Sequence, residues 1–174
     1  MDQVLQPLID MNEFAWEHFK DDLKDMTTEE VNWRLVPESN SINVIVRHLR
    51  IEAQWHLASL AHGEPMPIEI SATDQQLIDS VPLDFDRNLK ELEELYTRFI
   101  TALRVTTVAG LQERTAIAYA AWARQPAHFL GFHQLLHLTM HWGQIRTIRN
   151  LYRKTRGEPG RFFPYNPTIS AKTL

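Results

Sequence analysis

The sequence predicts an all-α fold, a four-helix bundle with long crossover connections. Apolar residues recur every three or four positions over four long stretches, as they do along amphipathic helices. The chain has only 6 glycines, and most of them lie between these stretches, where loops are expected. No series of short alternating strands stands out, so an α/β fold is a distant second. We expect residues 1–174 to form one domain with a substantial core.

The first two-thirds of the chain should contain three of the four long helices. The first is expected at about residues 2–25, and a short helix follows it after a capping box at Thr27–Glu30. The second long helix covers an apolar stripe over residues 42–60. A crossover with three prolines, residues 63–83, then leads to a third helix that Asp84 caps.

The last third of the chain has a less regular pattern. Residues 106–110 are typical of a loop, and residues 117–122 fit either a helix or a short extended segment. Pro126 suits the first turn of a fourth helix. That helix is expected to reach Arg156, a length of ~45 Å at 1.5 Å per residue. The tail, about residues 158–174, is rich in proline and aromatic residues and is expected to be irregular.

The composition excludes several kinds of chemistry. There is no cysteine, which rules out disulfides, a cysteine nucleophile and cysteine metal ligands. The net charge of -4 gives no global electrostatic reason to expect nucleic acid as the partner. The first residues lack the basic leader of a secretory signal, and no segment approaches the ~18 consecutive apolar residues of a membrane span. We therefore expect a cytoplasmic protein without a membrane partner.

The segment HLTMHWGQ in the fourth helix carries the pattern that bears most on function. His137 and His141 are four residues apart, so both rings can direct a nitrogen at one point beside the helix. His133 lies ~12 Å along the axis from His141 and cannot readily join them. The candidate third ligand is His48 in the second helix, where an ionisable residue among apolar neighbours needs a partner. Another interpretation stays open, because such pairs are common without a metal and a lone histidine is often a hydrogen-bonded core residue.

These residues resemble those of a known superfamily. Asn40-Ser41-Ile42 leads to Val46-Arg47-His48-Leu49, and His137-x3-His141 is followed by Gly143-Gln144-Ile145. With the order of the helices and the tail Phe162-Phe163-Pro164-Tyr165, this pattern is similar to that of the DinB/YfiT-like superfamily. Its members are bacterial four-helix bundles that hold a divalent metal with three histidines. The resemblance implies that His48, His137 and His141 are the metal ligands and that the protein is a homodimer.

The resemblance also implies a metal-dependent enzyme, because the superfamily includes thiol-dependent S-transferases and hydrolase-like proteins. We expect thiol S-transfer to, or hydrolysis of, a small electrophilic substrate. Three neutral imidazoles leave a coordination position open, and Zn²⁺ or Ni²⁺ suits such a shell. A chain without cysteine needs a low-molecular-weight thiol cosubstrate for the thiol reaction. The alternative is a non-catalytic metal-binding module of the stress response.

Three further residues are candidates to orient the ligands, although none is assigned as catalytic. Glu52 could accept a ring N–H or act as a base, His133 could line the mouth of the site, and Gln144 could hydrogen-bond across the bundle. Each also has a simpler explanation as a solvated or core residue. Gly143 is expected to permit close approach of two helices. The other histidines, His56 among them, are expected to be ordinary core or surface residues.

The end of the fourth helix is basic. Its cations are Arg146, Arg149, Arg153, Lys154 and Arg156. Such a stripe can contact phosphates, but cations at a helix C-terminus also complement the helix dipole and solvate an exposed face. Nucleic-acid binding is therefore a distant third hypothesis.

Overall fold

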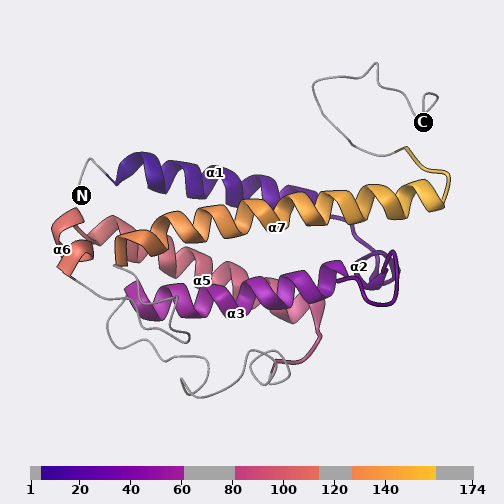
Figure 1. Ribbon diagram of the computed structural model, residues 1–174, viewed down its shortest axis with the longest axis horizontal. Helices are drawn as coiled ribbons and strands as arrows, with labels where there is room; N and C mark the ends of the chain where they lie inside the picture. The colour runs from indigo at the N-terminus through magenta and orange to yellow at the C-terminus, as the bar shows by residue number, and fades with distance from the viewer. Residues whose placement is uncertain (1–4, 61–80, 114–126, 160–174) are drawn as a thin grey trace.

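The computed structural model describes residues 5–60, 81–113 and 127–159. Four long helices in these ranges lie alongside one another (Figure 1), which confirms the predicted all-α bundle. No strand occurs in the described part of the chain. The helices are α1 (Gln6–Leu23), α2 (Thr28–Asn32), α3 (Ile42–Leu60), α5 (Phe85–Val105), α6 (Val108–Glu113) and α7 (Ala127–Thr155).

The four long helices form two parallel pairs. α1 and α7 run side by side in one direction, while α3 and α5 run together in the opposite direction (Figure 1). Arg50 of α3 forms an ion pair with Glu91 of α5 at 2.8 Å. Because α3 and α5 are parallel, the end of α3 and the start of α5 lie at opposite ends of the bundle, as a crossover connection requires. The sequence predicts that role for residues 63–83, of which residues 63–80 lie outside the described part of the chain.

The helix ends follow the local signals with one exception. The Thr27 hydroxyl accepts a hydrogen bond from the Glu30 backbone N–H at 3.1 Å, and Asp84 caps α5. Gly157, at φ 72°, ends α7 in the left-handed conformation that favours glycine. The prediction of a loop at residues 106–110 is wrong for 108–110, which begin α6. There Thr107 accepts a hydrogen bond from the Gly110 N–H at 3.0 Å and thus caps a short helix.

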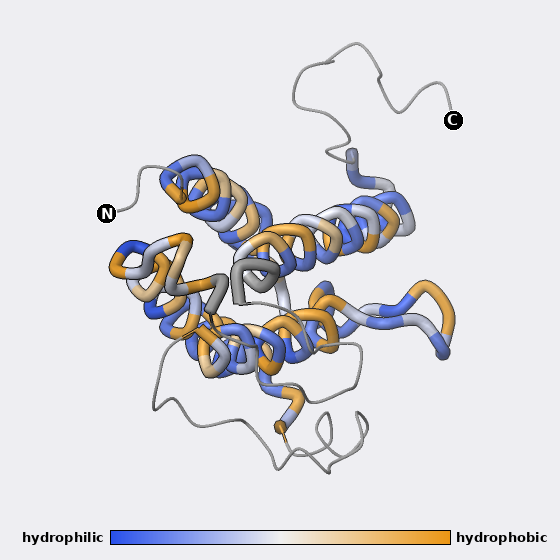
Figure 2. Tube along the Cα trace, turned by 60° about the vertical axis from the view of Figure 1, so that its left-hand side comes forward, coloured by the Kyte–Doolittle hydropathy of each residue, from blue (hydrophilic) through white to orange (hydrophobic). Residues whose placement is uncertain are grey.

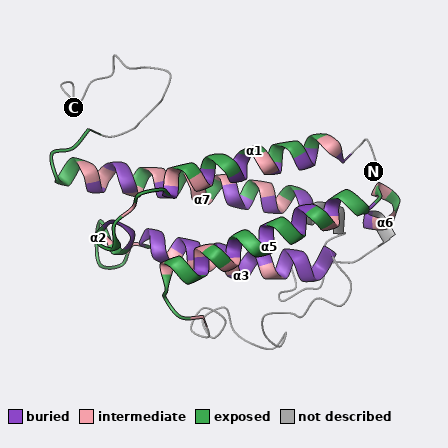
Figure 3. Cartoon of the chain, turned by 180° about the vertical axis from the view of Figure 1, so that it is seen from behind, coloured by how far each residue is buried: buried purple, intermediate pink, exposed green. Residues whose placement is uncertain are grey.

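α1, α5 and α7 each bury one face and expose the other, whereas every residue of α3 is buried or partly buried (Figures 2 and 3). Aromatic residues of α1 and α5 make much of the core: Trp16 stacks on Tyr96 with ring centroids 4.5 Å apart. The phenol of Tyr96 donates a hydrogen bond to the Asn12 side-chain oxygen at 2.9 Å, so both polar groups are paired in the interior. No helix in the described ranges is long and apolar enough to cross a membrane.

A glycine allows α1 and α7 to approach closely, but it is Gly131 rather than Gly143. A Cβ atom at Gly131 would lie 2.8 Å from Cδ2 of Leu8. Gly143 is exposed, and a Cβ atom there would meet nothing within 4 Å. The prediction that Gly143 permits close helix approach is therefore wrong.

At the basic end of α7, Arg149 forms hydrogen bonds to other parts of the bundle. The buried Arg149 donates to the Glu30 carboxylate at 2.9 Å. Its guanidinium also donates to the backbone oxygens of Asp22, in the last turn of α1, and of Lys24, its C-cap residue. Arg149 thus satisfies carbonyl groups that the helix terminus leaves open. This arrangement favours a structural role for this member of the basic stripe.

Candidate metal centre

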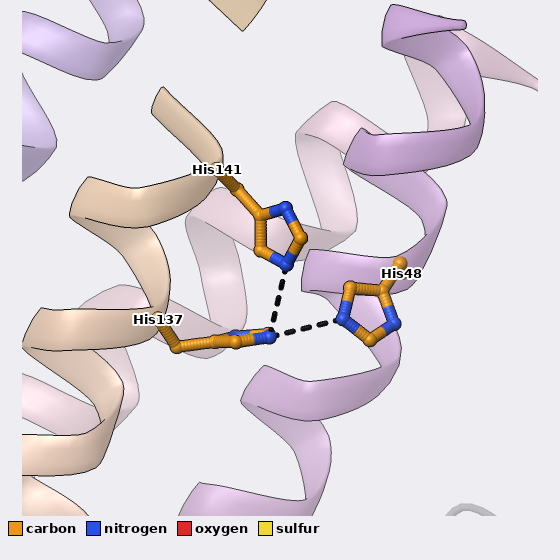
Figure 4. A group of neighbouring side chains, drawn as sticks. All are labelled: His48, His137 and His141. Atoms are coloured by element: carbon orange, nitrogen blue, oxygen red, sulfur yellow. Dashed lines mark hydrogen bonds between the residues drawn. The ribbon is translucent and has the colours of Figure 1, made fainter. Parts of the chain in front are cut away.

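The three predicted ligands meet between α3 and α7. His48 of α3 and His137 and His141 of α7 direct their Nε2 atoms at one point (Figure 4). The Nε2 atom of His137 lies 2.9 Å from that of His48 and 3.1 Å from that of His141. A tetrahedral ion with ~2.0–2.1 Å bonds separates two ligand nitrogens by about 3.3 Å. The cluster is therefore close to the size that one ion requires.

The arrangement follows from the two helices that carry it. His137 and His141 are one turn apart on α7, so they share a face. α3 runs antiparallel to α7 and places His48 opposite the pair (Figure 1). His137 is 8% exposed, whereas His48 and His141 are only partly buried. The centre is thus closed on the His137 side and more open on the side of the other two rings.

Burial keeps the ring of His137 uncharged. Burial, followed by the charges of His48 and His141, lowers the pKa of His137 to about 2. Burial also lowers the pKa of His141. Neutral imidazole is the form that binds a metal ion, so these shifts favour ligand nitrogens with free lone pairs near neutral pH.

A hydrogen bond fixes which nitrogen of His141 carries the proton. Nδ1 of His141 lies 2.7 Å from the side-chain oxygen of Gln144. An amide oxygen only accepts, so Nδ1 donates and Nε2 faces the centre with its lone pair. Gln144 therefore orients the ring of His141 from within α7, and the prediction that it hydrogen-bonds across the bundle is wrong.

The donor set fits a divalent metal. Nε2 of His137 can carry one proton at most, so it cannot donate to both neighbouring Nε2 atoms. Whether it carries the proton or the lone pair, it can hydrogen-bond to only one of the two, so the nitrogens of the other close contact repel each other. A cation at the centre would remove this repulsion, and imidazole nitrogen suits Zn²⁺ and Ni²⁺.

A second pair of histidines lies beside the centre. His56 is fully buried; its Nδ1 donates to the backbone oxygen of Glu52 at 2.6 Å, and its Nε2 lies 2.8 Å from Nδ1 of His133. Burial lowers the pKa of His56 to about 3, so its ring is neutral and Nε2 accepts the proton of His133 Nδ1. The ring of His133 stacks on that of His137 with centroids 5.5 Å apart. The structure thus places His133 beside the three-histidine cluster and not within it.

His56 was not expected at the site, although the sequence carries a signal for it. His48, Glu52 and His56 recur every four residues along α3, in the same way as His133, His137 and His141 along α7. Glu52 is buried on this face. The backbone oxygen of Glu52 orients His56. That the Glu52 carboxylate acts as a base, or accepts a ring N–H from a ligand histidine, stays a prediction.

Comparisons with known proteins agree with this fold. Residues 8–154 match the family described as mycothiol-S-transferase, a DinB/YfiT-like family, which confirms the resemblance seen in the sequence. The fold is similar to that of a solved structure described as a conserved protein from Enterococcus faecalis, with a TM-score of 0.68 and 18% identity over 91% of this chain and 99% of that chain. No curated protein matches the sequence. The chain belongs to the mycothiol S-transferase family.

Proposed function

We propose that the protein is a metal-dependent S-transferase that joins a low-molecular-weight thiol, such as mycothiol, to a small electrophile. The main support is the convergence of three imidazole Nε2 atoms on one point in a member of a thiol transferase family. The chain has no cysteine, so the reacting sulfur comes from the cosubstrate. In the reaction the sulfur forms a bond to an electrophilic carbon, and the bond from that carbon to its leaving group breaks.

The histidines and Gln144 have separate tasks in this proposal. A divalent metal held by His48, His137 and His141, with Zn²⁺ or Ni²⁺ as the best fit, would bind the thiol sulfur and favour its thiolate form. Gln144 holds the ring of His141 with Nε2 toward the centre. His137 closes the inner side of the site against water, since it is buried. The partly exposed rings of His48 and His141 leave the outer side open to the substrates.

Metal analysis tests the centre. The purified full chain should contain about one divalent metal ion per molecule. His48→Ala, His137→Ala and His141→Ala should each lose the metal and keep their helical circular dichroism. His18→Ala, which removes an exposed histidine of α1, is the matched control and should keep it. Full metal occupancy in all three ligand variants would refute the assignment.

An activity assay separates the reactions that such a centre supports. The metal-loaded protein should join mycothiol to an activated alkyl or aryl halide, and His137→Ala should not. Consumption of the electrophile without any thiol would indicate hydrolysis by a bound water in place of transfer. A protein that holds its metal but shows neither reaction would be the non-catalytic metal-binding module.

We also propose that the protein is a homodimer in the cytoplasm. Phe132, Leu136 and Met140 of α7 are 61%, 67% and 50% exposed and lie four residues apart, so they form one apolar stripe on the surface. Such a stripe suits an interface in which a second copy presents the same surface. Leu136→Glu should convert a dimer to a monomer in light scattering, whereas a wild-type chain that is already monomeric would refute the dimer.

A further inference from the structure

Two buried polar atoms near the centre lack partners. Nδ1 of His137 and Oε1 of Gln134 have no hydrogen bond to any described residue. Both side chains are in the interior of the bundle, since Gln134 is 2% exposed and His137 is 8% exposed. Unpaired polar atoms at such depth are rare because they lose their hydrogen bonds to water without replacement.

The two atoms are chemically complementary. When Nε2 of His137 serves as a ligand nitrogen, the proton of the neutral ring must be on Nδ1, which makes Nδ1 a donor. Oε1 of Gln134 is an acceptor. The two residues are three positions apart on α7, and side chains at this spacing are neighbours on a helix.

α7 already contains a pair of this kind. His141 and Gln144 are also three residues apart, and Nδ1 of the histidine donates to Oε1 of the glutamine at 2.7 Å. The order is reversed in the other pair, where Gln134 precedes His137. Each of the two candidate ligands that α7 supplies therefore has a glutamine three residues away along the helix.

We propose that Gln134 is a positioning residue of the metal centre, whose Oε1 accepts a hydrogen bond from Nδ1–H of His137 in the metal-loaded protein. The proposal rests on the proposed function only through the metal at the three histidines, not through the reaction. The two atoms are not hydrogen-bonded to each other in this structure, so the bond requires a rotation of the Gln134 side chain. The bond fixes the ring and the tautomer of the most buried ligand, and it does so away from water, where a hydrogen bond is stronger than at the surface.

Zinc affinity is the direct test. Zinc dissociation constants are measured by competition with a chromophoric chelator for the wild type, Gln134→Met and Gln134→Glu. Gln134→Met removes the acceptor and should weaken zinc binding about 10- to 100-fold. Gln134→Glu keeps an acceptor oxygen and should bind zinc within a few-fold of the wild type. Gln144→Met is the matched control, and its loss should be smaller because Gln144 is exposed.

A second measurement separates positioning from a structural role. Urea unfolding of each variant in the presence of a chelator gives the stability of the metal-free protein. Equal zinc affinity of a folded Gln134→Met and the wild type would overturn the proposal while the three-histidine centre stands. A wild type that binds no zinc would instead overturn the centre, and the proposal with it.

A measurement on the unmodified protein keeps the test valid if Gln134→Met does not fold. In the zinc-loaded wild type, the Nδ1 proton of His137 should give a downfield NMR signal that exchanges slowly with water. A His137 ring whose Nδ1 proton lacks this downfield shift would overturn the proposal.

Discussion

Acid should destabilise the metal-free protein through its buried histidines. Burial, followed by the charge of His133, lowers the pKa of His56 from 6.5 to about 3. Burial, followed by the charge of His48, lowers the pKa of His137 to about 2. The unfolded chain therefore binds protons more readily than the folded one between these values and pH 6.5. The contribution of these two neutral rings to the free energy of unfolding is complete above pH 6.5 and is lost as the pH falls toward 3.

The size of the effect follows from the pKa differences. At pH 5 the ordinary histidine pKa lies about 1.5 units above the pH, and each unit corresponds to about 1.4 kcal/mol. His56 and His137 should therefore each lower the free energy of unfolding by about 2 kcal/mol at pH 5. The sum of about 4 kcal/mol is large against a typical total of about 5–15 kcal/mol. The pKa values of His133 and His141 are also lowered by burial, and they act in the same direction.

Urea unfolding followed by circular dichroism measures this loss, with a chelator present to keep metal out. The free energy of unfolding should fall by about 4 kcal/mol between pH 7.5 and pH 5. His56→Gln removes one titrating group and should lose about half of that dependence, while the exposed His18→Gln should retain it. A wild type whose free energy of unfolding is equal at pH 7.5 and pH 5 would refute the buried, neutral state of these rings.

Three further substitutions in α7 test its packing. Arg149→Met should lower the free energy of unfolding by about 3–5 kcal/mol, because it removes the closest partner of the buried Glu30 carboxylate. A loss below about 1 kcal/mol in urea unfolding would contradict this role, since that is the range of exposed pairs. Gly143→Ala should stabilise the protein by about 1 kcal/mol because it adds a good helix former at an open position. Gly131→Ala should be about 1–3 kcal/mol less stable than Gly143→Ala, because its Cβ meets Leu8; equal melting temperatures would contradict the close approach.

The long helices could be predicted because each carries an apolar stripe over several turns. The short helix α6 could not, since a threonine followed by a glycine is as typical of a loop as of an N-cap and a first turn. Thr107 has the second role here. The two glycines of α7 show a related limit: the sequence places both on the helix, but only the packing against α1 decides that Gly131 meets a neighbour and Gly143 does not.

The site could be predicted in part for a similar reason. The four-residue spacing within α7 pairs His137 with His141, because both belong to one helix. The apolar neighbours of His48 made it a candidate third ligand, but whether it meets the pair depends on how α3 lies against α7. Spacing does not reveal that packing, and the family resemblance implied it. The family resemblance did not include His56. His56 is 77 residues from His133 in the sequence, and only the antiparallel packing of α3 on α7 brings the two rings together.

The separation of the ligands along the chain links ion binding to folding. His48 and His137 are 89 residues apart, so an ion held between them would close a loop of that length. In an unfolded chain the entropic cost of such a loop is on the order of 4 kcal/mol. The α7 pair alone can form as soon as that helix does, but the complete set of three nitrogens exists only once α3 has docked on it. A partly folded molecule would therefore lack the complete set of three nitrogens, and the fraction of chains that bind an ion would measure the fraction in which both halves of the bundle have come together.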